Sequence, residues 1–331
     1  MKNNIFITNY KTENDIKIIQ KQIKALKDYF ETALADNLEL TRVSAPLFVD
    51  PETGLNDNLN GVEQAVGFNL KDGQHLEIVQ SLAKWKRYAL KKYNLRGLYT
   101  DMNAIRPDED LDNLHSLYVD QWDWEKVIDE KMRDIDLLKA FVEGIYKAIK
   151  DTDKYMVDNF NTRDHRLPDR ITFITTQELL DKYPTLSSKE RENAIIREKK
   201  AVFIVGIGNK LSNGLPHDSR AADYDDWSLN GDLLLYHETL DIALEISSMG
   251  IRVNKDSLLK QLKEKNEEYK LKFDYHQNII NNLLPLTIGG GIGQSRLCMY
   301  FLDKAHIGEV QSSYWSKEDI EEFKKYNIIL L

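Results

Sequence analysis

The chain has 331 residues with 54 Asp plus Glu, 45 Lys plus Arg, a formal net charge of -9 and one cysteine. This length suffices for one large domain or two ordinary ones, and one thiol excludes an intramolecular disulfide and a cysteine-rich zinc site. The acidic balance argues against a nucleic-acid partner, and no apolar run resembles a signal peptide or a membrane span, so we expect a cytoplasmic protein with no membrane partner.

The first quarter of the chain begins with a helical pattern and continues with extended stretches. Apolar residues at spacings of three and four predict a long helix over residues 12–34, with Thr12 as its N-cap. Residues 40–48 are expected to be extended. Asp72 and Gly73 separate two apolar runs within residues 66–79, which predicts a β-hairpin.

The next segment contains a predicted strand, loop and strand between helices. Ser81 is expected to cap a basic helix that ends near residue 93. Apolar patterns then predict strands at 97–106 and 115–122, separated by a polar, acidic loop. Residues 125–160 have a helical pattern.

The second half of the chain continues the mixture of helices and strands. Helices are expected at 177–199 and 255–282, strands at 201–207, 229–237 and 241–253, and a glycine-rich turn at 287–296 that leads into an apolar helix. Strands interrupted by a hairpin and by long helical blocks indicate an α+β fold with a largely antiparallel β-sheet flanked by helices. No linker or repeat divides the chain, so we expect a single domain over residues 1–331.

Several common enzyme motifs are absent from the sequence. There is no P-loop, and Gly206 and Gly208 begin a G-x-G pattern in which Leu211 replaces the third glycine. There is also no H-E-x-x-H and no G-x-S-x-G. Rossmann, zincin and serine-hydrolase interpretations therefore lack their usual support.

Three segments, in order, resemble the three signature motifs of class II aminoacyl-tRNA synthetases. The first contains Val43, Pro46, Leu47 and Phe48 after the long predicted helix. In that family the first motif forms the dimer interface, so the resemblance implies a homodimer and a class II synthetase-like catalytic domain.

The second segment contains an arginine at the end of a predicted strand. The resemblance implies that Arg106 binds the α-phosphate of ATP, that the following loop frames the adenine, and that His115 and Ser116 belong to the nucleotide site. A guanidinium matches phosphate oxygens bidentately and stays charged at any working pH. The alternative is that Arg106 pairs with Asp108 or Asp110 on the loop surface.

The third segment is the glycine-rich stretch 289–296. Glycines allow a nucleotide to approach the backbone closely, and the following helix N-terminus presents free N–H groups. The resemblance implies that Gly291 and Gly293 line the nucleotide site and that Arg296 lies against the triphosphate or the adenine. The alternative is a flexible turn that caps a helix.

Two acidic residues precede the glycine-rich segment on neighbouring predicted strands. The resemblance implies that Asp232 and Glu245 hold Mg²⁺ on the phosphates, which suits a hard cation that prefers oxygen ligands. Glu245 with Gly250 and Arg252 is similar to the aspartyl and asparaginyl branch of the class. The alternative is a pair of carboxylates on exposed strand faces.

Further strings extend the resemblance over nearly the whole chain. RPDEDLDNLHSLYVDQWDWE, VGIGNKLSNG, DYDDWS and GGGIGQSR are closely similar to ammonia-dependent asparagine synthetases. The positions of the motifs leave no room for an anticodon-binding domain, which we expect to be absent. The resemblance implies that L-aspartate, ATP and ammonia give L-asparagine, AMP and pyrophosphate through β-aspartyl-AMP, with Mg²⁺ as cofactor.

The same resemblance implies a pocket for aspartate and ammonia. Asp57 is a candidate for orienting or deprotonating the incoming ammonium, since ammonium is no nucleophile until it loses a proton. Lys86 is expected to bind the aspartate carboxylate; the alternative is one more solvated cation among Lys84, Arg87, Lys91 and Lys92. The implied pocket residues are Asp57, Ser81, Lys86, Gln121, Asp123, Asp225 and Ser248, and the implied catalytic residues are Asp57, Lys86, Arg106 and Arg296.

The nitrogen donor follows from the position of the only cysteine. Glutamine-using asparagine synthetases need an N-terminal cysteine nucleophile, whereas this sequence begins Met-Lys and has Cys298 as its only thiol, which we expect to be a buried helix residue. Two other interpretations stay open. One is a stand-alone aspartyl or asparaginyl-tRNA synthetase-like enzyme, or a paralogue, with another acceptor; the other is a catalytically silent paralogue that serves as a binding or regulatory module.

Overall fold

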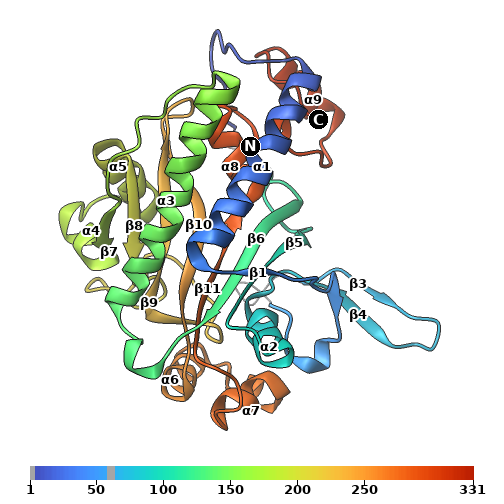
Figure 1. The fold of residues 1–331 in the computed structure, drawn as a ribbon, viewed down its shortest axis with the longest axis vertical. Helices are drawn as coiled ribbons and strands as arrows, with labels where there is room; N and C mark the ends of the chain where they lie inside the picture. The colour runs from blue at the N-terminus through green and yellow to red at the C-terminus, as the bar shows by residue number, and fades with distance from the viewer. Residues whose placement is uncertain (1–3, 58–63) are drawn as a thin grey trace.

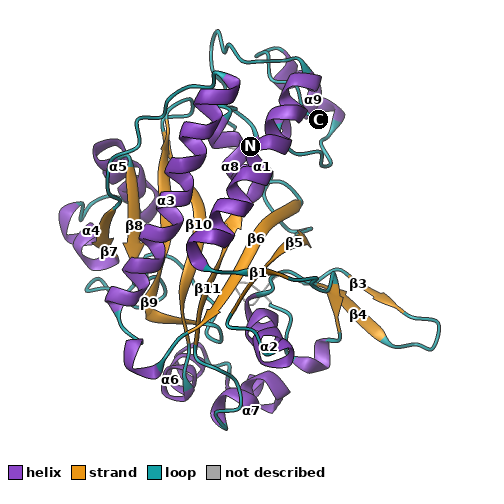
Figure 2. Ribbon diagram, in the orientation of Figure 1, coloured by secondary structure: helices purple, strands orange, loops and turns teal. Residues whose placement is uncertain are grey.

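The centre of the computed structural model, which describes residues 4–57 and 64–331, is an eight-stranded sheet (Figure 2). Neighbouring strands are antiparallel except for the parallel pairs at its two edges, β1 with β5 and β7 with β8. In spatial order the strands are β1 (Thr41–Arg42), β5 (Gly97–Ile105), β6 (Tyr118–Val127), β11 (Thr287–Gly293), β10 (Ile242–Arg252), β9 (Asp225–His237), β8 (Ala201–Val205) and β7 (Thr172–Thr175).

A smaller sheet and the helices surround this centre. The smaller sheet has the order β2 (Phe48–Val49), β4 (His75–Ile78) and β3 (Gly67–Asn69), and its β3–β4 hairpin projects from the body in Figure 1. The α-helices are α1 (Ile16–Leu38), α2 (Ala83–Tyr93), α3 (Ile135–Phe160), α4 (Thr176–Lys182), α5 (Ser188–Lys199), α6 (Lys255–Lys265), α7 (Asp274–Ile280), α8 (Gln294–Phe301) and α9 (Lys317–Lys324). Within residues 4–57 and 64–331, none of the helices has the length and apolar character needed to cross a membrane.

One face of the large sheet is covered by long helices. Successive side chains of a strand point to opposite faces, so Trp122 and Trp124 of β6 lie on the same face. They belong to one buried apolar cluster with Phe30 of α1, Val142 of α3 and Leu297 of α8. Figure 1 shows α1 and α3 side by side across this face. The largest part of the core therefore lies between these helices and the sheet.

The opposite face is covered only towards its two ends. At one end α2 packs on β5, where Leu90 and Met102 share a small apolar cluster. At the other end α5 packs on β8 and β9, where Ile196 and Ile204 belong to another cluster. Between these two clusters the central strands present polar residues of β6 and β10 and the glycines of β11. This arrangement leaves a polar opening over the middle of the sheet.

The predicted α+β class and the largely antiparallel sheet are confirmed. The hairpin is also confirmed, with Gly73 at φ 93° in the turn. The first helix begins later than predicted, at Ile16, because Asp15 is its N-cap and accepts hydrogen bonds from the first-turn N–H groups. Thr12 is not the cap; its hydroxyl instead accepts a hydrogen bond from Lys304 Nζ at 2.6 Å. The extended stretch 40–48 is divided between β1 and β2 in two different sheets.

Three predicted helices have different boundaries in the structure. Residues 125–127 continue β6, because Glu125 pairs with Gly289 of β11, and α3 starts only at Ile135 after its N-cap. The helix predicted over 177–199 is two helices, since Pro184 lies between them and each begins with its own capping box. Residues 255–282 are likewise interrupted, because α6 ends at a left-handed Asn266. The basic helix α2 starts at Ala83, one position after Leu82 as N-cap, although Ser81 Oγ accepts the Ala83 N–H at 3.1 Å.

Candidate active site

The glycine-rich segment forms a strand rather than the predicted turn. β11 lies between β6 and β10, and Gly291 is directly opposite Asp123 on one side and Ser248 on the other. A Cβ at Gly291 would stand 2.5 Å from Gln121 Oε1 and 2.7 Å from Asp123 Oδ1. The glycines therefore let the polar side chains of β6 lean across β11, and helix α8 begins directly after Gly293.

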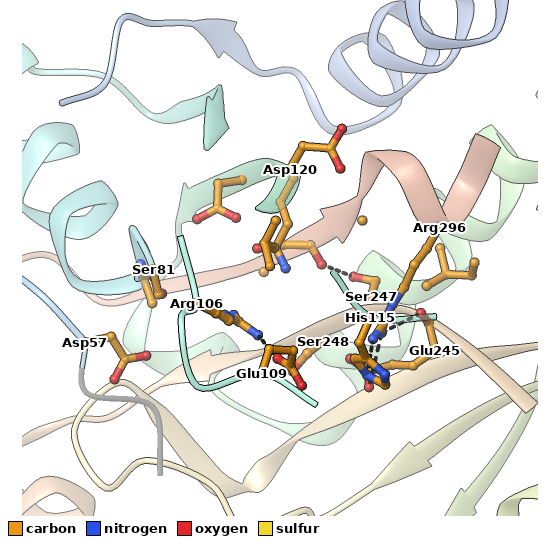
Figure 3. A pocket seen from close by; sticks show the side chains of 18 of the residues that line it. Asp57, Ser81, Arg106, Glu109, His115, Asp120, Glu245, Ser247, Ser248 and Arg296 are labelled. Carbon is orange, nitrogen blue, oxygen red and sulfur yellow. Dashed lines mark hydrogen bonds and ion pairs between the residues drawn. The ribbon is translucent and has the colours of Figure 1, made fainter. Parts of the chain in front are cut away.

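A cavity of about 470 Å³ opens above these strands (Figure 3). The structure brings together all but one of the site residues predicted from the sequence; Asp232 is the exception and is absent from the lining. The predicted residues that line the cavity are Asp57, Ser81, Lys86, Arg106, His115, Ser116, Gln121, Asp123, Asp225, Glu245, Ser248, Gly291, Gly293 and Arg296.

Lys86 of α2 reaches the floor of this cavity. Its ammonium lies 3.1 Å from Asp123 Oδ2 and donates a hydrogen bond to the Gly290 carbonyl at 2.8 Å. Burial lowers the pKa of Lys86, although Asp123 opposes this effect. The alternative of a solvated lysine is therefore wrong for Lys86. Two other cations of the same helix are not solvated either. Lys84 is buried and pairs with Asp223, and the buried Arg87 donates hydrogen bonds to backbone carbonyls.

A buried guanidinium that was not predicted as a site residue lies beside Lys86. Arg252 of β10 donates from Nε and Nη2 to Glu125, at 3.0 and 2.7 Å, and also pairs with Asp225. Burial raises the pKa of Asp225 despite this pairing. For Glu125 burial would raise the pKa, but Arg252, Lys86 and Thr287 together lower it. Arg252 was noticed in the sequence only as part of a motif, because its partners come from two other strands, β6 and β9.

The side chains around Lys86 and Arg252 carry more negative than positive charge. Two cations of the lining, Lys86 and Arg252, stand against Asp123 and Asp225 of the lining and against Glu125, which is fully buried outside it, so the formal sum of this cluster is −1. Asp123 Oδ1 is buried and has no hydrogen-bond partner among the described residues. This acidic part of the cavity is suited to bind a cationic nitrogen group.

The predicted Asp57 lies at the end of the described segment 4–57 and is almost fully buried. The pKa of Tyr224 is well above its usual value, mainly because the tyrosine is buried and also because of the negative charge of Asp57. Tyr224 also lines the cavity and was not predicted. The sequence DYDDWS contains this tyrosine and Asp225, but nothing in the string distinguishes the tyrosine from an ordinary core residue.

Arginines form a second, cationic part of the cavity. Arg106 at the end of β5 has its closest ion-pair partner in Glu109, at 4.0 Å, rather than in Asp108 or Asp110. Within the part of the chain that the structure describes, its buried Nε has no hydrogen-bond partner. This geometry disfavours the alternative that Arg106 only forms a surface ion pair on the loop.

Arg296 lies on the far side of the cavity from Ser81, at the start of α8 (Figure 3). Its Nη1 donates to the Glu245 carbonyl at 3.1 Å and lies 3.7 Å from Glu245 Oε2. Its Nη2 is 3.0 Å from His115 Nε2. The residues predicted for the nucleotide from the second and third segments are thus in direct contact.

The two predicted metal ligands are close but are not equivalent. Glu245 lines the cavity, whereas Asp232 is not in the lining; it lies opposite Ser248 on β9 and pairs with Arg220 at 2.6 Å. Burial and, more weakly, the Glu245 charge raise the pKa of Asp232 to about 6, although Arg220 opposes them. Arg220 lines the cavity and was not predicted, since it lies outside all three motifs.

A buried hydrogen-bond network supports the nucleotide side of the cavity. Ser116 Oγ donates to Gln311 Oε1 at 2.5 Å, and Gln311 Nε2 donates to Asp120 Oδ1 and Ser295 Oγ. Asp120 also accepts the Ser295 N–H and lies 3.1 Å from Lys27 of α1. Gln311 was not predicted, because it follows the last motif by more than a dozen residues and has no local signal.

Comparison with known proteins gives the fold an independent reference. Asparaginyl-tRNA synthetase from Pyrococcus horikoshii, solved with asparaginyl-adenylate, superposes with a TM-score of 0.60 at 16% identity, over 88% of this chain and 67% of that chain. Aspartyl-tRNA synthetase from Entamoeba histolytica gives a TM-score of 0.58 at 18% identity, over 89% and 57% of the two chains. These similarities show that the fold is that of class II synthetase catalytic domains, as predicted.

Sequence comparison extends over almost the full length of the chain. A family model described as aspartate-ammonia ligase matches residues 17–327. An aspartate–ammonia ligase from Ruminiclostridium cellulolyticum is 57% identical over 327 residues, which cover 97% of this chain and 97% of that protein. One from Fusobacterium nucleatum is 55% identical over 325 residues, with 97% and 99% coverage.

Proposed function

Because the chain belongs to the aspartate–ammonia ligase family, whose members make asparagine, we propose that the cavity over β11 binds aspartate, ammonia and ATP and forms asparagine through β-aspartyl-AMP. The observation that most supports this assignment is the division of one cavity into an acidic part around Asp123 and a cationic part around Arg106 and Arg296. A zwitterionic amino acid and a nucleotide need these two environments side by side.

In the first step the aspartate side-chain carboxylate attacks the α-phosphorus and pyrophosphate leaves with the electrons of the broken P–O bond. Lys86 binds a carboxylate of the substrate, and the acidic floor with Gln121 and Asp123 binds its ammonium group. Ser81, Asp225 and Ser248 complete this subsite. Negative charge grows on the phosphoryl oxygens, so the guanidiniums of Arg106 and Arg296 stabilise the transition state more than the ground state.

In the second step ammonia attacks the activated carbonyl carbon and AMP leaves. Ammonium must first lose a proton, because only the neutral form has a free lone pair. Asp57 is the proposed acceptor or orienting group for this proton, since it lines the cavity on the side of Ser81. The adenosine lies on the side of His115, Ser116, Gly291 and Gly293.

Mg²⁺ is proposed to bind Glu245 and Asp232 together with the phosphates of ATP. The donor set fits the ion, since Mg²⁺ commonly takes one or two carboxylates and completes its shell with phosphates and water. After burial, the Glu245 charge also raises the pKa of Asp232, so the two carboxylates are near enough to interact, as two ligands of one ion must be. When bound, Mg²⁺ would neutralise charge on the phosphates.

A homodimer is also proposed, and it would use the first motif. Around the small sheet, Leu47 and Phe48 are exposed by 53% and 44%, and Phe68 and Leu70 by 38% and 42%. Such a cluster of apolar side chains is typical of a subunit interface. Light scattering on the purified protein tests this assignment. We also propose a cytoplasmic location, and that residues 1–331 form one catalytic domain.

The test of the reaction is a product assay with aspartate, ATP and ammonium. We expect asparagine and AMP, not ADP, in equal amounts. Aspartate-dependent ATP–pyrophosphate exchange isolates the first step, and Arg106→Ala and Arg296→Ala should each abolish it in a folded protein. Wild-type exchange in either variant would overturn the phosphate assignment. Transfer of aspartate to tRNA or to a protein lysine, with no amide from ammonium, would favour the alternative acceptor.

A further inference from the structure

Asp112 lies in the acidic loop between Arg106 and His115 and does not line the cavity. Its Oδ1 accepts hydrogen bonds from the backbone N–H groups of Leu114 and His115, at 2.7 and 2.9 Å. The same oxygen lies 2.8 Å from the ring Nδ1 of His115. One carboxylate oxygen thus turns the end of the loop and also holds the imidazole that follows.

The protonation of the His115 ring follows from its second contact. His115 Nε2 is 3.0 Å from Arg296 Nη2, and a guanidinium has only donors, so Nε2 must be the acceptor. The ring proton is therefore on Nδ1, where it is donated to Asp112. Burial alone would raise the pKa of Asp112, but hydrogen bonds from the His115 ring and from the backbone N–H groups of Leu114 and His115 lower it, so the carboxylate stays charged as the acceptor.

These contacts form a relay from the loop to a proposed nucleotide ligand. The Arg296 guanidinium is held on one side by His115 of the loop and on the other by the Glu245 carbonyl of β10. Figure 3 shows His115, Glu245 and Arg296 together at one side of the cavity. A long side chain held by two contacts loses less rotamer freedom when a ligand binds.

We propose that Asp112 is a positioning residue for nucleotide binding, which fixes His115 as the Nδ1–H tautomer so that Nε2 holds Arg296 ready for the polyphosphate of ATP. This inference rests on the proposed function, in which Arg296 binds the nucleotide. It assigns a role to a residue that does not line the cavity. It also explains how His115 can present an acceptor nitrogen to a permanent cation.

The test is equilibrium binding of ATP with Mg²⁺, measured by calorimetry without aspartate, together with steady-state kinetics. Asp112→Ala should weaken ATP binding about tenfold, since a charge-assisted hydrogen bond is lost. The KM for ATP should rise in parallel, while the KM for aspartate stays within about twofold. Asp110→Ala is the matched control, because Asp110 is an exposed carboxylate of the same loop that does not line the cavity.

A double variant separates the relay from a general effect on the loop. If Asp112 acts through His115, Asp112→Ala combined with His115→Ala should bind ATP no more weakly than His115→Ala alone. Nitrogen-15 NMR of the histidine rings should show the Nδ1–H tautomer of His115 in the wild type and its loss in Asp112→Ala. Asp112→Asn keeps an oxygen for the backbone N–H groups, so it should fold and lose about threefold in ATP affinity.

The outcomes distinguish this inference from the function on which it rests. Wild-type ATP binding by Arg296→Ala would overturn the proposed nucleotide site itself. If Arg296→Ala binds weakly but Asp112→Ala behaves like Asp110→Ala, only the positioning role is wrong. Additive losses in the double variant would also overturn it. If Asp112→Ala fails to fold, Asp112→Asn decides. Wild-type ATP affinity and an unchanged His115 tautomer in Asp112→Asn would overturn the positioning role.

Discussion

The Lys86 ammonium and the Asp123 carboxylate form an ion pair of 3.1 Å that is almost completely shielded from solvent. The pair joins α2 to the centre of the sheet, and Lys86 also donates to the Gly290 carbonyl. Its position at the cavity floor makes it a part of both the folded structure and the proposed aspartate subsite. A substitution there should therefore affect stability and activity by different routes.

We expect Lys86→Met to lower the free energy of unfolding by about 3–5 kcal/mol, since it leaves a buried carboxylate without its cation. Aspartate-dependent exchange should be lost. The double variant Lys86→Met with Asp123→Asn removes both charges and should recover much of the stability without recovering exchange. Denaturant unfolding measures the first effect. A double variant no more stable than Lys86→Met would show that the two charges do not compensate each other.

Gly291→Ala should reduce aspartate-dependent exchange about 100-fold while the fold persists, because small displacements of positioned groups have large kinetic effects. The new methyl group would meet Gln121 Oε1 at 2.5 Å and Asp123 Oδ1 at 2.7 Å, so both side chains must leave their places. Gly293→Ala is the matched control, since its nearest neighbour is Arg296 Cβ at 3.3 Å. Equal effects of the two variants would contradict this steric explanation.

The glycine segment shows what local sequence reasoning captures and what it misses. Its position and its closeness to the site were predicted, but its structure was predicted as a turn, since glycine's conformational freedom is usually needed there. In the structure Gly291 is needed for a different reason. It gives room to Gln121 and Asp123, which are distant in sequence and adjacent only through the pairing of β6 with β11.

The buried cations show the same limit. Arg87 belongs to a helix that is basic in sequence, and nothing local indicates that its guanidinium donates to the carbonyls of Val253 and Pro285. Arg252 was missed as a site residue because its carboxylate partners lie on other strands, and Arg220 because it lies outside the motifs, in the loop before β9. Residues within the strings that resemble the family could be predicted to lie at one site, whereas the ion pairs and hydrogen bonds that join distant parts of the chain could not.

For Asp57→Asn we expect exchange to continue and asparagine formation to fall. The amide keeps the shape of the carboxylate but cannot accept a proton from ammonium at neutral pH. Rapid quenching should then show that the adenylate accumulates when ammonium is limiting. A rise in asparagine formation by Asp57→Asn with pH, as more free ammonia becomes available, would support the role of Asp57 in proton removal. If exchange and amide formation fall equally, Asp57 serves substrate binding instead.

Outside the cavity lining, His165 lies 2.6 Å from Asp153 and 3.6 Å from Asp303. Burial alone would lower its pKa, but hydrogen bonds and charges from these carboxylates raise it to about 9. The folded state then binds a proton that the unfolded state releases above its usual pKa of about 6.5. The protonated His165 therefore contributes about 3 kcal/mol to the free energy of unfolding. This contribution is fully present below pH 6.5 and is lost as the pH rises through 9.

His165→Gln should therefore flatten the decrease of the free energy of unfolding between pH 6.5 and 9.5, measured by denaturant titration at several pH values. His237→Gln is the control, because burial lowers the pKa of His237 to about 4 and its ring does not titrate in this range. His237→Gln should change the pH dependence of the free energy of unfolding only below about pH 6.5, where the unfolded state gains the proton first. An unchanged alkaline slope in His165→Gln would show that this histidine is not charged in the folded protein.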